Sequence, residues 1–263
     1  MTSQTQASSA GLKWIAFDAI VMTKRNLLKY VRVPSLFLFS TIQPVMFVLL
    51  FAFVFGGAID IPGINYLDFL MPGIFIQTSL FGSQNTGVGL ADDMNKGMID
   101  RFRSLPMSRS AVLAGRTISD SIRNLFVVIL MSVVGYIIGF RFAGSFIESA
   151  GALLLVALFG SAFSWISATI GLAVKDVEVA QTAGFLWVFP LTFASSAFVP
   201  VETMPTWLQA FAEINPVTVA IDTVRALVLD QPVGNNIWIM LAWIAAILMV
   251  FVPLAVDRYR KAV

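Results

Sequence analysis

The chain has 263 residues, of which 58% are apolar and only 12% charged, and its mean hydropathy is +0.85. A soluble globular domain carries roughly 25% charged residues, so this composition excludes an ordinary soluble fold and indicates an integral membrane protein. The sequence has no cysteine, which excludes disulfides and thiol nucleophiles, and no histidine, the commonest general base and metal ligand. The net charge is only +2, so its placement matters more than its size.

The first predicted element is a basic amphipathic helix over residues 12–32. Its apolar residues recur at roughly helical spacing, and its basic residues lie elsewhere around the helix. This pattern is typical of a helix in the inner membrane interface, and Pro34 marks the bend into the first span. Two roles remain open, a membrane anchor and a surface for a partner. The apolar positions are Trp14, Phe17, Ile20, Val21, Leu27, Leu28 and Val31.

Six runs without a charged residue predict six transmembrane helices, because a hydrocarbon core of ~30 Å needs ~20 helical residues. The third run is the shortest, and we expect Arg123 and Arg141 at its two ends to snorkel to the interfaces. The predicted fold class is therefore all-α and integral to the membrane, in one domain over residues 1–263. The runs are Val33–Ile59, Phe69–Ala91, Asn124–Phe140, Ser149–Val174, Val179–Val201 and Gln231–Val256.

The basic residues predict the orientation, since lysine and arginine concentrate in cytoplasmic segments. A six-span arrangement leaves only Arg141 and Arg225 on the extracytoplasmic side. Seven of the 15 acidic residues lie on that side: Asp60, Asp68, Glu148, Glu202, Glu213, Asp222 and Asp230. Both termini are therefore expected in the cytoplasm, and a five- or seven-span arrangement loses this segregation. The predicted cytoplasmic basic residues are Lys13, Lys24, Arg25, Lys29, Arg32, Lys96, Arg101, Arg103, Arg109, Arg116, Arg123, Lys175, Arg258, Arg260 and Lys261.

Two connecting segments carry patterns of their own. In the cytoplasmic loop 92–121, the apolar residues between Met98 and Leu105 alternate with charges and Pro106 ends the pattern, which suits either a docking helix or a solvated loop. Ser108 is expected to cap the next helix, which continues into the third span. In the extracytoplasmic segment 200–231, two short apolar helices flank Asn215-Pro216. They fit either a re-entrant helical hairpin between the fifth and sixth spans or an interfacial cap. Asp222 and Arg225 are spaced to pair there.

The residues available for chemistry argue against an enzyme and an ion-coupled carrier. There is no phosphate-binding loop and no catalytic triad. The interiors of the six runs hold no ionisable residue, whereas ion-coupled carriers usually place one at mid-depth. Their neutral polar groups serve either helix–helix hydrogen bonds or a large amphipathic cargo. The candidate translocation path comprises Gln43, Phe47, Phe51, Gln77, Phe81, Asn85, Thr192, Ser195 and Ser196.

Two separated motifs identify a family resemblance. The stretch Asn95-Lys-Gly-Met-Ile-Asp-Arg-Phe-Arg-Ser-Leu-Pro106, followed by Ser108-Arg109 and Gly115-Arg116, closely resembles the signature of the ABC-2 permease family. It is most similar to the daunorubicin- and doxorubicin-resistance type. The string Phe198-Val-Pro200-Val-Glu202-Thr-Met-Pro205-Thr-Trp207, then Asn215-Pro216 and Arg225, is similar to that family as well. Many relatives carry a threonine where this chain has Met98, so no hydroxyl role is expected there.

The resemblance implies the permease subunit of an ATP-binding cassette exporter in the bacterial plasma membrane, without a nucleotide site or cofactor of its own. ATP and Mg²⁺ are expected on a separate ATPase subunit, in two copies, and a second copy of this chain or a paralogous permease completes the transporter. Membrane lipid, but no nucleic acid, is expected as a further partner. The implied docking surface comprises Lys24, Arg25, Lys29, Arg32, Gly97, Met98, Ile99, Arg101, Phe102, Leu105, Pro106, Arg109, Gly115 and Arg116.

The cargo stays open between related classes. A drug-like or lipid-like amphipathic molecule suits the phenylalanine-rich spans, and the same scaffold serves exporters of lipids and lipid-linked glycans. An ion-coupled secondary carrier is the alternative from another class.

Overall fold

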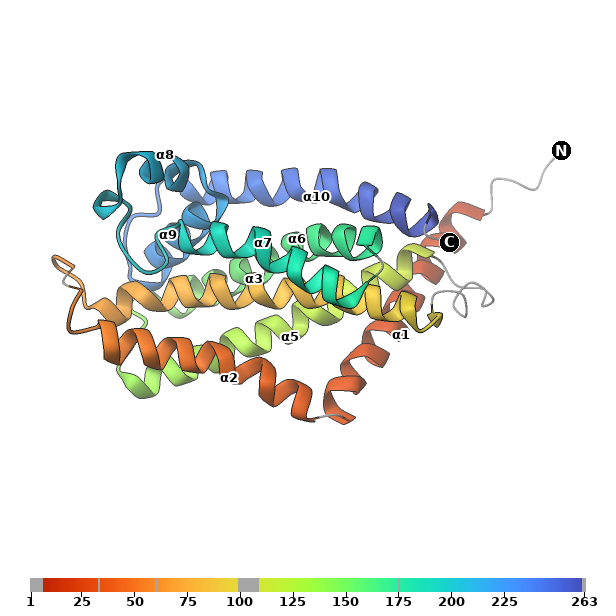
Figure 1. Ribbon diagram of the computed structural model, residues 1–263, viewed down its shortest axis with the longest axis horizontal. Coiled ribbons are helices and arrows are strands. Elements are labelled where there is room, and N and C mark those ends of the chain that lie inside the picture. Colours follow the sequence, from red (N-terminus) through yellow and green to blue (C-terminus); the bar gives the residue numbers. More distant parts are fainter. Residues whose placement is uncertain (1–6, 33, 60, 99–108, 175, 262–263) are drawn as a thin grey trace.

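The computed structural model describes residues 7–32, 34–59, 61–98, 109–174 and 176–261, and helix is the only regular secondary structure in these ranges. Helices α2, α3, α5, α6, α7 and α10 run along the long axis of the molecule (Figure 1). The helices are α1 (Ala7–Arg32), α2 (Pro34–Leu50), α3 (Tyr66–Asn95), α5 (Arg109–Ile138), α6 (Phe146–Val174), α7 (Val177–Phe193), α8 (Thr206–Ile214), α9 (Pro216–Val228) and α10 (Asn236–Lys261).

Most of each predicted apolar run lies on its own helix, but the fifth run extends beyond the end of α7 at Phe193 and the sixth begins before α10. Within the described ranges, α6, α10 and the part of α5 from Ala111 to Ile138 are long and apolar enough to cross a membrane. Two shorter helical stretches, Thr41–Phe55 and Val177–Phe193, are also apolar. The first of these continues from α2 through the π-helical turn Phe51–Phe55. The chain is therefore a helical membrane protein, as its composition predicts.

The third helix begins well before its apolar run, which confirms the prediction that a helix starts after Ser108 and continues into the third span. The apolar run begins at Asn124, but α5 begins at Arg109, so its first half is helix that carries charged residues. Likewise, α3 continues to Asn95. Much of the segment 92–121 therefore belongs to the C-terminal end of α3 and the N-terminal part of α5, and is not a loop. Of this segment, residues 99–108 lie outside the described ranges.

Helix α3 is the centre of the bundle, and it is buried without interruption from Phe69 to Leu80. It approaches α6 closely because both helices carry small residues at the contact. A Cβ added at Gly171 of α6 would overlap the backbone of Gly87, and one at Gly160 would overlap Ser79. Small residues that let two backbones approach are typical of helix packing in membranes.

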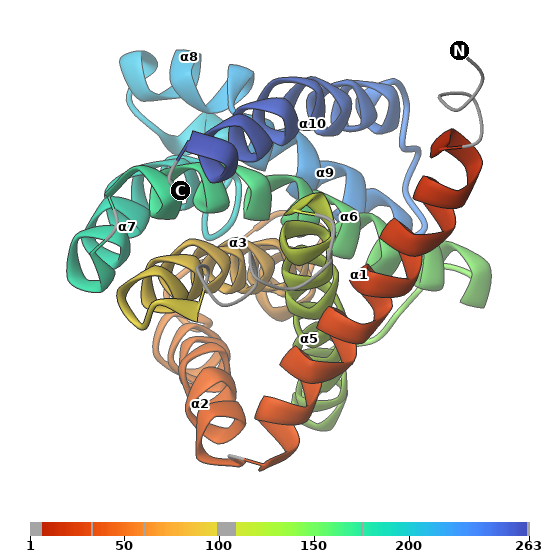
Figure 2. The ribbon, with the colours of Figure 1, turned by 90° about the vertical axis from the view of Figure 1, so that its right-hand side faces the viewer.

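Helix α1 lies across α5 at one end of the bundle (Figure 2). Ala19 and Met22 are buried there, and Gly115 of α5 makes the close approach possible, since a Cβ at this position would overlap both residues. The hydroxyl of Thr23 donates to the carbonyl oxygens of Ala19 (2.7 Å) and Gly115 (3.2 Å). The opposite face of α1 exposes apolar side chains, Phe17, Ile20, Val21 and Leu28.

Helices α8 and α9 lie at the other end of the bundle (Figure 1). They follow the short 3₁₀ turn Val201–Thr203. The predicted break at Asn215-Pro216 is where α8 ends and α9 begins. Proline fits the first turn of a helix because its missing N–H has no helical partner there. Helix α8 exposes Trp207 and Ile214, whereas α9 is largely buried against the bundle.

Candidate functional site

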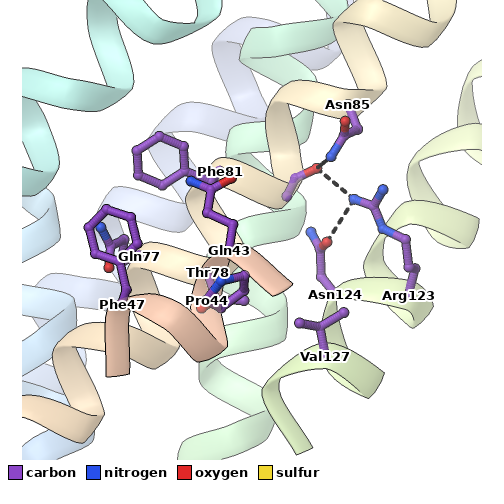
Figure 3. Close-up of a pocket in the computed structure, with 11 residues that line it drawn as sticks. Gln43, Pro44, Phe47, Gln77, Thr78, Phe81, Asn85, Arg123, Asn124 and Val127 are labelled. Atoms are coloured by element: carbon purple, nitrogen blue, oxygen red, sulfur yellow. Dashed lines mark hydrogen bonds between the residues drawn. The ribbon is translucent and has the colours of Figure 1, made fainter. Parts of the chain in front are cut away.

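A cavity of about 290 Å³ opens between α2, α3 and α5 (Figure 3). Its wall combines two aromatic rings with several amide side chains and one guanidinium group. Such a mixture of apolar surface and a few polar groups is typical of ligand sites. The lining residues are Gln43, Pro44, Phe47, Gln77, Thr78, Phe81, Gly82, Asn85, Arg123, Asn124 and Val127.

The cavity brings together five of the predicted path residues. Gln77, Phe81 and Asn85 are spaced four residues apart, so α3 presents them on one face. Gln43 and Phe47 have the same spacing on α2, opposite that face. Helical periodicity therefore explains why residues far apart in sequence line one site.

The other predicted path residues lie elsewhere. Phe51 is one helical turn beyond Phe47 and stacks on Phe47 and Phe198, with ring centroids 5.9 Å and 4.4 Å away. Thr192, Ser195 and Ser196 are buried at the end of α7 that faces α9. There Ser195 donates to the Thr192 carbonyl at 2.5 Å, and Ser196 donates to Asp222 at 2.7 Å. The side chains of Ser195 and Ser196 thus form hydrogen bonds inside the chain, whereas the Thr192 hydroxyl is buried without a hydrogen-bond partner in the structure.

Arg123 is the charged residue among the cavity residues that were not predicted as part of the path. We expected it at a membrane interface, but the structure places it in the middle of α5, only 6% exposed. Its Nη2 donates to the Gly82 carbonyl (2.7 Å) and to the Asn124 side chain (2.9 Å). The prediction considered only the position of Arg123 at the end of the charge-free run, and not the carbonyl of α3 that the guanidinium contacts. The spacing of Arg116, Asp120 and Arg123, which places all three on one face of a helix, was the available signal.

Glycine at position 82 permits this contact between α3 and α5. A Cβ there would overlap the Asn124 side chain, whose Nδ2 donates to the Ser79 carbonyl at 3.4 Å. Asn85 donates from Nδ2 to the same Gly82 carbonyl that Arg123 uses, at 3.3 Å. The polar side chains of the cavity wall thus donate hydrogen bonds to backbone carbonyl groups of α3.

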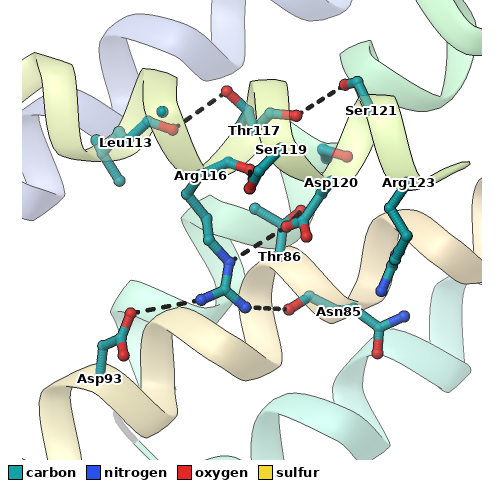
Figure 4. Close-up of polar contacts among 12 residues, drawn as sticks. Asn85, Thr86, Asp93, Leu113, Arg116, Thr117, Ser119, Asp120, Ser121 and Arg123 are labelled. Carbon is teal, nitrogen blue, oxygen red and sulfur yellow. Dashed lines mark hydrogen bonds and ion pairs between the residues drawn. The ribbon is translucent and has the colours of Figure 1, made fainter. Parts of the chain in front are cut away.

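A cluster of charged and polar side chains continues along the same two helices (Figure 4). The Arg116 guanidinium bonds the carboxylates of Asp93 (3.4 Å) and Asp120 (3.3 Å) and the carbonyl of Asn85 (3.2 Å). Asp120 is 1% exposed and also accepts from the Thr86 hydroxyl at 2.7 Å. Gly89 makes room for the guanidinium, since a Cβ there would overlap it. The cluster therefore joins α3 to α5 next to the cavity.

The predicted docking residues are distributed over three places. Lys24, Arg25 and Arg32 are exposed on α1, whereas Gly115 and Arg116 pack inside the chain against α1 and α3. Gly97 follows the end of α3 with a φ of 62°, the left-handed conformation that favours glycine after a helix. Met98 is half-buried. Only the helical backbone is described for Lys29 and Arg109, and Ile99, Arg101, Phe102, Leu105 and Pro106 lie outside the described residues.

A second polar cluster fastens α9 to α3 and α7. Arg225 is 8% exposed and donates to the carbonyl oxygens of Phe69 (3.0 and 3.2 Å) and Ser196 (2.7 Å) and to Asp222 (2.7 Å). Burial lowers the pKa of Arg225 to about 10 although Asp222 opposes the shift, so the guanidinium is charged at neutral pH. Its carbon Cζ lies 3.8 Å from the centre of the Phe69 ring.

Asn215 makes a related contact at the junction of α8 and α9. Its side chain accepts from the Val217 backbone N–H at 2.9 Å, which caps α9. Its Nδ2 donates to the carbonyls of Leu191 and Ala194, both at 2.8 Å, at the end of α7. The Asn-Pro motif therefore starts one helix and ties it to another.

Among the described residues, no three His, Cys, Asp or Glu side chains are grouped to hold a metal ion. The described site offers amide and guanidinium groups beside aromatic rings, and a cluster of charged side chains between α3 and α5 lies next to it.

Comparison with known proteins gives consistent results. Residues 18–229 match the model of the family described as ABC-2 type transporter. The chain is 33% identical over 237 residues to the daunorubicin resistance ABC transporter permease protein DrrB1 of Streptomyces coeruleorubidus, covering 90% of this chain and 84% of that protein. It is 27% identical to the probable doxorubicin resistance permease DrrC of Mycobacterium tuberculosis, over 93% of this chain and 89% of that protein. It is 24% identical to the probable multidrug permease YbhR of Escherichia coli, over 68% of this chain and 50% of that protein.

Proposed function

Because the chain belongs to the ABC-2 type transporter family and is a permease subunit, we propose that it exports an amphipathic molecule, drug-like or lipid-like, from the cytoplasm or the inner leaflet. A separate ATPase subunit, which binds ATP and Mg²⁺, supplies the energy. The observation that carries this proposal is the cavity between α2, α3 and α5, whose aromatic and amide groups lie within the apolar runs. The names of these relatives, which refer to daunorubicin resistance, doxorubicin resistance and multidrug transport, support a drug-like cargo.

The proposed topology has α2, α3, α5, α6, α7 and α10 as six spans and both termini in the cytoplasm of a bacterial cell. Its support is the arrangement of charge. Basic α1, the end of α3 with Lys96, and the end of α10 with Arg258, Arg260 and Lys261 lie at one end of the bundle (Figure 1). Cytoplasmic segments are enriched in such residues. Helices α8 and α9, at the opposite end, form the proposed re-entrant hairpin.

The proposed assembly has two permease chains, either identical or paralogous, and two ATPase subunits docked at the basic end. The exposed basic side chains Lys24, Arg25 and Arg32 of α1 support this location. Helix α1 packs on α5 through Gly115, and α5 forms part of the cavity wall. A force applied to α1 therefore reaches the cavity through these two packed helices. This gives the ATPase a mechanical route to the proposed path.

The test uses the permease and its ATPase in proteoliposomes, with doxorubicin fluorescence as the readout of transport. We expect ATP-dependent doxorubicin transport, and we expect the double variant Arg101→Glu with Phe102→Ala to lose most of it while both subunits remain folded. The matched control is Glu213→Ala, an exposed position on α8 at the other end. Full transport by the double variant contradicts the docking assignment. Uphill transport by the permease alone, driven by an ion gradient, contradicts the proposed function.

A further inference from the structure

We infer that the groove between α1 and α5 binds an anionic phospholipid of the inner leaflet, with the phosphate at Lys24 and an acyl chain along α5. This inference goes beyond the proposed function and uses only its placement of α1 at the cytoplasmic end. Three observations carry it: the apolar wall of the groove, its charge, and the apolar surface that continues from it into the membrane.

The groove opens between the two helices where α1 lies across α5 (Figure 2). Its volume of about 620 Å³ is within the ~300–1,000 Å³ range of ligand pockets. Thr23 belongs to the wall, but its hydroxyl already donates to the carbonyl oxygens of Ala19 and Gly115. The rest of the described wall, apart from one lysine, is aliphatic: Ala19, Ile20, Leu27 and Leu28 of α1, and Ile118 and Ile122 of α5.

The charge of the groove comes from Lys24, and no described lining residue is acidic. A lysine can lay its aliphatic stem along apolar surface and keep its ammonium group at the polar edge. In an interfacial helix that edge is at the level of the lipid head groups, and basic side chains at the cytoplasmic surface attract anionic lipids. The groove therefore offers an ammonium group to a phosphate and aliphatic side chains to an acyl chain.

The position of Lys24 around α1 separates it from the neighbouring arginines. Lys24 is four residues from both Ile20 and Leu28, so these three side chains share one face of the helix. Arg25 and Arg32 are seven residues apart and share another face. The inference thus assigns Lys24 to the lipid, whereas the two arginines remain part of the surface proposed for the ATPase.

A lipid, rather than a cytosolic protein, fits the groove because the apolar surface continues into the membrane. Ile118 and Ile122 begin a row of exposed apolar side chains on α5 that continues through Phe126, Ile129 and Val133. Their spacing of three or four residues places them on one face of a helix that is long and apolar enough to cross a membrane. At ~1.5 Å per residue, Ile118 and Ile129 are ~16 Å apart along the axis, which matches the ~15 Å depth of one leaflet.

The experiment measures lipid binding to the permease–ATPase complex by native mass spectrometry. The complex is titrated with phosphatidylglycerol, with phosphatidylcholine of the same acyl chains, and with glycerol phosphate, which has the charge without the chains. We expect phosphatidylglycerol to bind about fivefold more tightly than phosphatidylcholine, the ratio expected for one basic side chain at a membrane surface. Equal binding of the two lipids overturns the inference, and so does glycerol phosphate that binds as tightly as phosphatidylglycerol.

Variants distinguish this groove from the other basic parts of the chain. Lys24→Gln is expected to remove the fivefold preference, and Lys24→Arg to retain it. Ile118→Trp fills the groove without changing its charge and is expected to weaken phosphatidylglycerol binding several-fold. The matched controls are Lys96→Gln at the end of α3 and Met249→Trp at an exposed position of α10, and both are expected to bind as the wild type does. A preference that survives Lys24→Gln unchanged overturns the inference.

The ATPase supplies a further test of the occupant. If adding the ATPase to the permease displaces phosphatidylglycerol from the Lys24-dependent site, the groove is a protein surface and the inference is wrong. The two proposals fail separately. Loss of ATP-dependent doxorubicin transport in the wild-type complex removes the proposed function but not a lipid preference that depends on Lys24. Absence of that preference in a complex that transports doxorubicin removes only the inference about the lipid.

Discussion

Replacing Arg225 with alanine tests whether the polar cluster at the α9 end holds the bundle together. The change removes the donor to the Phe69 and Ser196 carbonyls and the partner of Asp222. Removing one member of a buried ion pair typically costs ~3–5 kcal/mol. Because the Asp222 side chain is 37% exposed and regains water, we take the lower limit, about 3 kcal/mol. At ~2–4 °C per kcal/mol for a chain of this size, the midpoint of thermal unfolding falls by roughly 6–12 °C.

The assay is thermal unfolding of the detergent-purified chain, followed by the fraction that stays monodisperse after heating. Arg225→Lys keeps the charge but replaces a planar fork with a single ammonium group, so its midpoint is expected between those of the wild type and the alanine variant. Arg260→Ala, at an exposed position of α10, is the matched control and is expected to leave the midpoint unchanged. A decrease below about 2 °C for Arg225→Ala refutes the reasoning that its buried hydrogen bonds fasten α9.

Three further changes test the helix contacts by the same unfolding assay. Gly171→Ala is expected to lower the midpoint because its Cβ would overlap the backbone of Gly87, whereas Gly151→Ala in the same helix meets no atom within 4 Å and is expected to keep or raise it. Asn215→Ala loses a helix cap and two donors to α7, a cost of about 2 kcal/mol, and an unchanged midpoint shows that the junction is not fastened by this side chain. Asp120→Leu leaves Arg116 and Thr86 without their shared acceptor and is expected to destabilise the chain strongly. Lys96→Ala, which removes only an exposed pair with Asp92, serves as its control and is expected to have no measurable effect.

The sequence was sufficient to predict the helices themselves. Runs without charge predict membrane helices because an unpaired charge in hydrocarbon is costly, and most of each run is found on a separate helix. Asn215-Pro216 predicts a helix start because asparagine caps and proline fits the first turn, and α9 begins there. These are local properties of the chain, which a single sequence contains in full.

The same reasoning did not predict the contacts of Arg123, and the reason is physical. A charge-free run indicates where lipid can surround a helix, but not which residues of a neighbouring helix its flanking charges contact. A helix that packs against its own chain can continue with charged residues whose partners are on a neighbouring helix. For Arg123 that partner is the carbonyl of Gly82. Nothing local to either residue indicates that they meet.

Composition and spacing thus determined by themselves that this chain is a helical membrane protein and which residues share a helical face. The tertiary structure alone decided which faces meet. Gln43, Gln77 and Arg123 line one cavity because α2, α3 and α5 pack together, while Thr192 and Ser195 lie in another part of the bundle. Helical periodicity determines the direction in which a side chain leaves its helix. The neighbour that it meets in that direction depends on how closely the two backbones approach. Small residues such as Gly82 and Gly115 decide that approach across the whole fold.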